Sequence, residues 1–176
     1  EVVAVVAPSR EEVLASVGQD LGEHNWALLE PRTLTLRGHG GGGLEELKAA
    51  LDDREVLFGV LRFSFGGSSS VGGAAASSAP RSYQGITKHV LVHWVGPRVP
   101  VVQRGLMNAR LQRAAAVIGA CGAVAFRREA HGLADLQLED IVGELRRLAA
   151  FGYSGAASRG VAAARLTAEE YLATLA

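Results

Sequence analysis

The sequence predicts an α/β (α+β) domain in which a central mixed sheet of about five strands is flanked by helices. Two long apolar runs, at 56–65 and 89–95, have the composition of buried strands. Segments with helical periodicity lie before, between and after these runs. A chain of 176 residues is long enough for one well-buried domain and short for two. Helices and strands that follow one another in this way pack as layers around a sheet.

A helix is expected at the start of the domain. Ser9 and Glu12 have the spacing of a capping box, in which the hydroxyl accepts a backbone amide and the carboxylate reaches back. Apolar residues at helical spacing then predict a helix that runs to about residue 20. Residues 1–8 are short and begin with an acidic residue, so they do not resemble a signal peptide. We expect them to form a strand or an ordered arm.

A hairpin and a second helix are expected next. Short strands are predicted at 26–29 and at 33–37, the second because its residues alternate with period two. The glycine-rich stretch 38–43 is predicted to be a flexible loop before a short helix at 44–51. A phosphate-loop interpretation fails because two glutamates, and not lysine with serine or threonine, open that helix.

The middle of the chain is expected to hold the central strands and the longest helix. Residues 66–80 are almost all Gly, Ser and Ala, which predicts a long mobile connection between the strands at 56–65 and 89–95. A single long helix is predicted at 101–118. Three arginines, Arg104, Arg110 and Arg113, give this helix a basic character.

The last third is expected to hold a strand at 123–127 and two further helices. Asp135 is predicted to cap a helix that runs to about residue 148. Its inward residues are expected to be Ile141, Leu145 and Leu148. Residues 149–166 are rich in Ala and Gly and are expected to be weakly structured. A second capping box, at 167–170, predicts a short C-terminal helix.

The charges divide unevenly along the chain. The formal net charge is zero, so no overall field draws the protein to nucleic acid or to an anionic membrane. Residues 1–80 carry 6 basic and 11 acidic side chains, a net −5, whereas residues 81–176 carry 12 and 7, a net +5. This split either builds one acidic and one basic face or is neutralised by pairing within the fold.

No group of residues has the pattern of a catalytic or metal site. Cys121 is the only cysteine, which excludes an internal disulfide and suits a reducing compartment. Its apolar neighbours predict a buried thiol. His89 and His93 share one face of a strand, but no further ligands at a metal-binding spacing accompany them. We therefore expect no enzyme, no metal and no cofactor.

Four stretches of the sequence carry a family pattern. Residues 52–63 join an acidic lead-in to an apolar strand, and 88–96 form a strand that ends in Trp, Val and Gly. Residues 100–104 open the basic helix, and 135–141 open another with acidic residues. Together they resemble the actin-depolymerising-factor homology (cofilin-like) domain, in its coactosin-like branch, over about residues 9–153.

The resemblance implies how the chain is divided. We expect an N-terminal arm at 1–8 and the actin-depolymerising-factor homology domain at 9–153, with its flexible loop at 66–80. A C-terminal extension with a short helix is expected at 154–176.

The resemblance also implies a cytoplasmic, cytoskeletal protein that binds actin filaments without catalysis and without severing them. The coactosin-like branch has Arg-Ala-Lys in the long helix, where this chain has Arg104, Gly105 and Leu106. The arginine is kept, and the lysine is replaced by leucine. The implied actin-binding face consists of six residues of the long helix: Val102, Arg104, Leu106, Met107, Arg110 and Arg113.

A second hypothesis keeps the fold but assumes that the domain does not bind actin. In it the domain is a structural or scaffold subunit of a larger cytoskeletal assembly, such as a ciliary axoneme. Leu106 in place of lysine and the extra terminal segments motivate this hypothesis. The Ala-rich tail that ends in residues 167–176 would then dock as an amphipathic helix in a groove of a partner.

Overall fold

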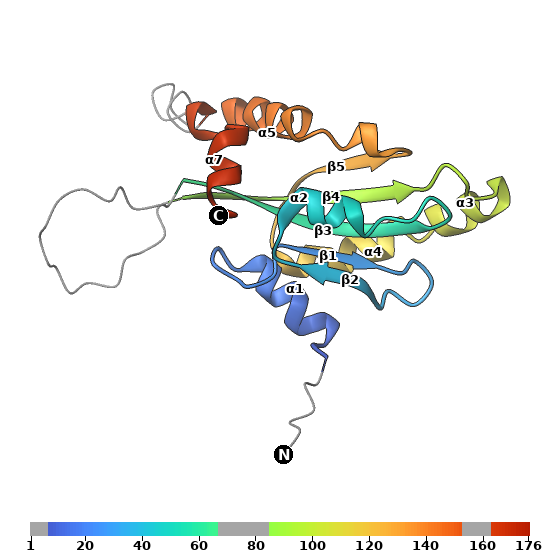
Figure 1. The fold of residues 1–176 in the computed structure, drawn as a ribbon. Coiled ribbons are helices and arrows are strands. Elements are labelled where there is room, and N and C mark those ends of the chain that lie inside the picture. Colours follow the sequence, from blue (N-terminus) through green and yellow to red (C-terminus); the bar gives the residue numbers. More distant parts are fainter. Residues whose placement is uncertain (1–6, 67–84, 153–162) are drawn as a thin grey trace, which may run out of the picture.

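Five strands form one mixed sheet in the order β2-β1-β3-β4-β5 (Figure 1). The computed structural model describes residues 7–66, 85–152 and 163–176. The strands are β1 (Trp26–Leu29), β2 (Leu36–Gly40), β3 (Val56–Phe65), β4 (Ile86–Val95) and β5 (Val124–Ala130). Neighbouring strands are antiparallel, except that β4 and β5 are parallel. The five-stranded mixed sheet predicted from the sequence is confirmed.

Helices cover both faces of the sheet, and each face has its own hydrophobic core. One face carries α2 (Gly43–Ala49), α5 (Leu138–Gly152) and α7 (Ala168–Ala173). The other carries α1 (Arg10–Gly18), α3 (Val101–Asn108) and α4 (Leu111–Ile118). Figure 1 shows α5 and α7 on one side of the sheet and α1 on the other. Because both faces are covered, all ten residues of β3 are buried.

Helix α1 begins with the predicted capping box. The Glu12 amide donates to the Ser9 hydroxyl at 3.2 Å, and the Ser9 amide donates to the Glu12 carboxylate at 2.7 Å. Near the other end, the buried Arg62 of β3 donates to the carbonyls of Ser16 at 3.0 Å and Gly22 at 2.8 Å. These carbonyls belong to the last turn of α1 and to the loop that follows it, so the guanidinium fixes the end of α1 to the sheet.

The second strand lies further along the chain than predicted. It begins at Leu36 and not at residue 33, and the glycines expected to form a loop supply the end of β2 and the start of α2. A Cβ at Gly40 would lie 2.2 Å from Oε2 of Glu46 and 2.8 Å from Nε1 of Trp26. These two atoms form a 2.7 Å hydrogen bond that ties α2 to β1. The loop prediction was wrong because the glycines make room for close packing.

The single helix predicted at 101–118 is two helices. Helix α3 ends at Asn108, and α4 begins three residues later. Between them the Arg110 amide donates to the Met107 carbonyl at 2.9 Å, which is the tighter turn of a 3₁₀ helix. The Asn108 side chain contacts the buried His93. The prediction was wrong on this point, and the 15-residue α5 is the longest helix in the described part of the chain.

Helix α5 begins later than predicted, at Leu138. Asp135 does not cap it; its carboxylate accepts the amides of His131 at 2.8 Å and Gly132 at 3.1 Å and closes a short 3₁₀ turn. Leu148, predicted to face inward, is 37% exposed because it lies beside the buried stripe. The prediction that Asp135 caps this helix and the prediction that Leu148 faces inward were both wrong. That stripe consists of Ile141, Val142, Leu145 and Ala149.

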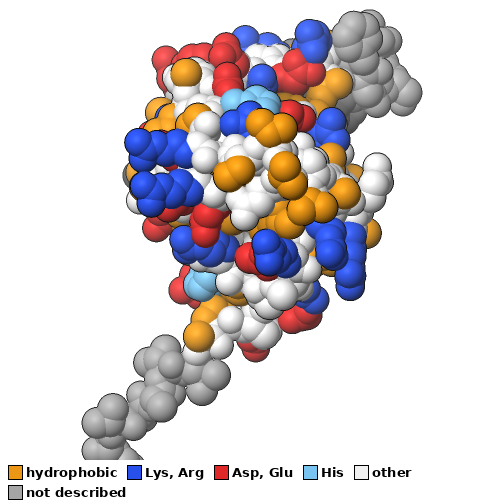
Figure 2. Space-filling view, turned by 90° about the vertical axis from the view of Figure 1, so that its right-hand side faces the viewer, with side chains coloured by type: hydrophobic (Ala, Val, Ile, Leu, Met, Phe, Trp, Pro, Cys, Tyr) orange, Lys and Arg blue, Asp and Glu red, His pale blue; other side chains and the backbone are white. Residues whose placement is uncertain are grey.

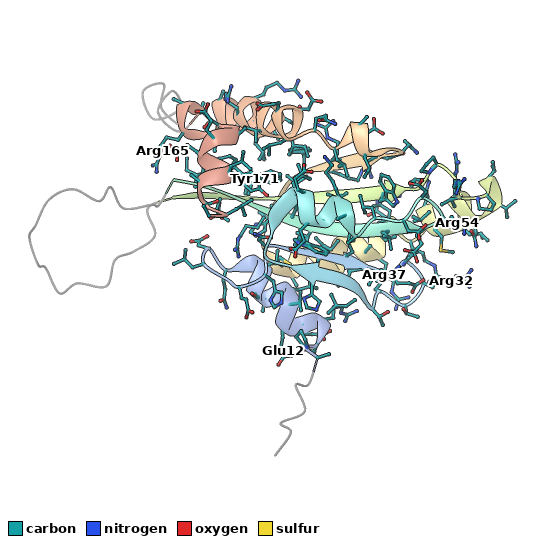
Figure 3. All side chains as sticks on the ribbon, viewed as in Figure 1. Glu12, Arg32, Arg37, Arg54, Arg165 and Tyr171 are labelled. Carbon is teal, nitrogen blue, oxygen red and sulfur yellow. The ribbon has the colours of Figure 1, made fainter. Side chains whose placement is uncertain are left out.

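The C-terminal helix α7 is built into the domain. Tyr171 is buried among the core residues between α7 and the sheet (Figure 3), with its ring 4.7 Å from that of Phe63. Its hydroxyl accepts the Leu44 amide at the start of α2 at 2.9 Å. Arg146 of α5 donates twice to the Leu166 carbonyl, at 3.0 and 2.7 Å. The apolar side that was expected to dock on a partner is therefore occupied by the chain's own core.

Two predictions fall mostly outside the described residues. They are the mobile connection at 66–80, apart from residue 66, and the N-terminal arm at 1–8, apart from residues 7 and 8. Helix α5 also continues past residue 149, where weak structure was expected. Within the described part, no helix combines the length and the apolar character needed to cross a membrane.

Candidate protein-binding surface on helix α3

Helix α3 presents its apolar side chains to solvent. None of its residues is fully buried. Val101, Val102 and Leu106 are 80%, 76% and 60% exposed, and they are three of the seven large apolar side chains exposed in the described part of the chain. Val102 and Leu106 are four residues apart and so lie on one side of the helix. Apolar residues gathered at one exposed place mark a surface for binding another molecule.

Arginines border this apolar group. Arg98 precedes α3, and Arg110 and Arg113 follow it; all three are exposed. None of the three forms an ion pair with another described residue. Figure 2 looks onto the end of the molecule where α3 lies and shows hydrophobic side chains gathered on this face with Lys and Arg around them. Arg32 and Arg54 lie at the same end (Figure 3).

Two of the six predicted site residues face the domain. Arg104 is half-buried, and its guanidinium is turned back to the preceding loop, where it donates to the carbonyls of Val99 at 2.8 Å and Pro97 at 3.1 Å. Met107 is half-buried and packs against the core beneath α1, α3 and α4. The other four lie on the surface: Val102, Leu106, Arg110 and Arg113.

Sequence reasoning missed two residues of this surface, Val101 and Arg98. Val101 lies in the first turn after Pro100 and is the most exposed apolar residue of the described chain. The sequence predicted one helix at 101–118, with Val102 and Leu106 on its binding face. The break after Asn108 makes α3 a separate helix. The sequence did contain a signal for Val101, because two valines directly follow the proline that starts the helix.

A small hollow adjoins the surface. It has a volume of about 130 Å³ and lies where α3 meets the β1–β2 turn and the start of β3. Gln103 and Met107 line it from α3, and two arginines with two glutamates line it from the other elements: Arg32, Arg54, Glu30 and Glu55. The concave edge beside the apolar group thus carries both charges and comes from segments far apart in the sequence.

The two histidines of β4 are buried beneath α1 and α3. Nε2 of His89 lies 2.9 Å from the Val17 carbonyl, and Nε2 of His93 donates to Oδ1 of Asn108 at 3.0 Å. Burial lowers the pKa of both imidazoles below their ordinary value of 6.5. Within the described residues, no cluster of three or more potential ligands is assembled around them. Both histidines therefore act as neutral hydrogen-bonding groups of the core.

We expect acidification from about pH 7 to pH 5 to lower the free energy of unfolding. Unfolded histidines have a pKa near 6.5, so the unfolded chain binds more protons than the folded one in this range. The stability is fully present above the unfolded pKa and falls by up to about 1.4 kcal/mol per pH unit for each histidine until the folded pKa is reached.

Urea denaturation across this pH range measures the effect. The slope should diminish when His89 and His93 are both replaced by glutamine. An unchanged slope in the double variant would assign the pH dependence to other groups.

Cys121 is not arranged as a nucleophile. Its side chain is buried, and burial raises the pKa of the thiol to about 11. The thiol is therefore protonated at neutral pH, and reactive cysteines are thiolates. It fills space beside α1, as the sequence predicted.

The sequence profile of the cofilin/tropomyosin-type actin-binding proteins matches residues 5–146. No curated protein sequence matches the chain significantly.

Solved structures share the fold at low identity. Coactosin from Entamoeba histolytica has a TM-score of 0.60 and 22% identity, covering 77% of this chain and 90% of its own. Human coactosin-like protein has a TM-score of 0.58 and 17% identity, covering 78% and 95%. Mouse coactosin, described as an actin filament binding protein, has a TM-score of 0.54 and 17% identity, covering 82% and 88%. At these identities the likeness establishes the fold.

Proposed function

The chain belongs to the family of cofilin/tropomyosin-type actin-binding proteins, and from this premise we propose that it is a coactosin-like protein that binds actin filaments. It does so without catalysis and without severing the filament, and it works in the cytoplasm as part of the cytoskeleton. The binding surface is the exposed side of α3 with the arginines around it.

One observation carries this proposal: α3 exposes Val101, Val102 and Leu106 in a fold that buries apolar residues elsewhere on both faces of its sheet. Protein interfaces combine an apolar centre, which is desolvated on binding, with a polar rim. The unpaired Arg110 and Arg113 supply such a rim on the side of α4. The partner surface is thus apolar at its centre and acidic at its edge.

Leu106 shifts the expected binding energy of this surface from charged contacts toward apolar contacts. A lysine there would add a charged contact, whereas leucine adds apolar area to the group formed with Val101 and Val102. Burying apolar area contributes about 25 cal/mol per Å², and salt does not screen it. Binding should therefore depend on salt through the rim arginines and retain a salt-insensitive part.

Co-sedimentation with actin filaments at low and moderate salt tests the proposal. We expect pelleting at low salt that weakens as salt rises, because salt screens exposed charges beyond about 10 Å at 0.1 M. Reversing the charges of Arg110 and Arg113 to glutamate should weaken binding at least about fivefold and flatten the salt dependence. Arg147→Glu on α5, across the sheet from α3, is the control and should bind as the unaltered protein does.

Absence of pelleting at either salt would favour the second candidate function. In that case the fold serves as a structural or scaffold subunit of a larger cytoskeletal assembly, such as a ciliary axoneme, without actin. The replacement of the family's lysine by Leu106 is the feature that favours it. The surface for such a partner would again be α3. The apolar side of α7 is not free for a partner, because Tyr171 on that side is buried in the core of the domain.

A further inference from the structure

We propose that Arg104 and Asn108 are positioning residues, which hold α3 in the orientation that meets its partner, and that His93 is the anchor for Asn108. This inference rests on the proposed role of α3 as the binding surface. It gives Arg104 a different task from the ionic contact that the sequence suggested.

Helix α3 has little apolar packing to fix it. Its inward side offers the half-buried Met107 and no fully buried residue. Helix α4, by contrast, buries Ala114 and Ile118 against the sheet. The break after Asn108 also separates α3 from the buried residues of α4. Polar contacts must therefore determine the direction in which α3 points.

The first of these contacts lies at the end of α3. His93 projects from the central strand β4, is 2% exposed, and stacks on Phe58 with ring centroids 5.1 Å apart. Packing thus fixes the imidazole. Its Nε2 donates to Oδ1 of Asn108, the last residue of α3, at 3.0 Å. The hydrogen bond ties the end of a solvent-exposed helix to an immobile point in the sheet.

The second contact lies at the start of α3. Arg104 donates through Nε to the Val99 carbonyl at 2.8 Å and through Nη2 to the Pro97 carbonyl at 3.1 Å. The planar guanidinium has a fixed fork of donors, so two such bonds define an orientation that a single ammonium group cannot reproduce. They hold the loop at 97–100 against the first turns of α3. The outward directions of Val101 and Val102 depend on this loop.

Removal of the His93–Asn108 bond should weaken binding about fivefold, the effect of losing one hydrogen bond of about 1 kcal/mol. Asn108→Ala and His93→Leu should have the same effect, and the double variant should bind no worse than either, because both remove one contact. His93→Gln keeps an N–H donor and should restore most of the affinity.

Thermal unfolding distinguishes positioning from a general structural role. His93→Leu removes a buried polar group, and the partner that it leaves, Asn108, is exposed and can bond to water, so the stability can stay unchanged. We expect its unfolding midpoint to stay near that of the unaltered protein while its affinity falls. Unchanged affinity in both Asn108→Ala and His93→Leu would overturn the proposal for this contact.

Salt dependence gives the corresponding test for Arg104. Arg104→Lys keeps the charge and loses the fork, so it should bind several-fold more weakly with the same slope of affinity against salt. Arg147→Lys, at an exposed position of α5 across the sheet from α3, is the matched control and should bind normally. Full affinity of Arg104→Lys would refute the positioning role and would indicate that Arg104 contributes only its charge.

Hydrogen exchange tests the positioning without any partner. The Ala109 and Arg110 amides bond to the Gly105 and Met107 carbonyls at the end of α3. Their exchange should be about fivefold faster in Asn108→Ala and His93→Leu, matching the loss of affinity. If the unaltered protein does not bind filaments, the proposed function fails, and this measurement still decides the positioning role. Equal exchange rates in all variants would refute it.

Discussion

Deletion of residues 163–176 is expected to unfold the domain or to lower its unfolding midpoint severely. Tyr171 is buried in the core, packs on Phe63 and Phe65, and accepts the amide of Leu44. Removing a buried aromatic side chain costs about 3–5 kcal/mol, a large part of the roughly 5–15 kcal/mol that holds a typical domain together. The deletion also removes the Thr174 hydroxyl that donates to the Ser64 carbonyl of β3 at 3.2 Å.

Point variants separate the contributions of this helix. Tyr171→Ala should approach the effect of the deletion, measured by urea or thermal unfolding. Tyr171→Phe keeps the packing and leaves the buried Leu44 amide without its acceptor, which should cost about 1–3 kcal/mol. Leu172→Ala changes a neighbour that is 50% exposed and is the control. A truncated protein with an unaltered midpoint would show that the family domain is complete without its C-terminal helix.

The long elements could be predicted from the sequence because their patterns are local. The runs that became β3 and β4 are apolar enough to be buried on both faces, and the capping box of Ser9 and Glu12 needs only four adjacent residues. Tyr171 within a short capped helix was also visible. The surface on which Tyr171 packs could not be predicted, because an amphipathic helix has the same sequence pattern whether its own domain or a partner covers it.

The errors arise where distant residues decide local structure. The glycines of β2 resemble a loop until Trp26 and Glu46 are seen to occupy the space beside Gly40. The helix break after Asn108 lies where this residue bonds to His93, fifteen residues earlier and buried in another element. The same break decides which residues of the candidate site are exposed. Membership of the α3 surface therefore could be predicted in part, and the inward direction of Arg104 could not.

Replacement of Leu106 by aspartate is expected to abolish filament binding while the fold is preserved. Leu106 is 60% exposed and lies on the same outer side of α3 as Val102, so the substitution removes nothing from either core. Fully burying a leucine side chain contributes about 1.5–3 kcal/mol, which is a factor of about ten or more in affinity. The new carboxylate would also be desolvated without a partner, which adds to the loss.

The matched control is Leu21→Asp, because Leu21 is 77% exposed and lies in the turn after α1, on another part of the surface. Both variants should unfold at the midpoint of the unaltered protein, and only Leu106→Asp should fail to pellet with filaments. Loss of binding in both would point to a general effect of added negative charge. Binding by Leu106→Asp at full strength would exclude the exposed side of α3 as the contact, because no apolar interface retains its affinity with an unpaired carboxylate at its centre.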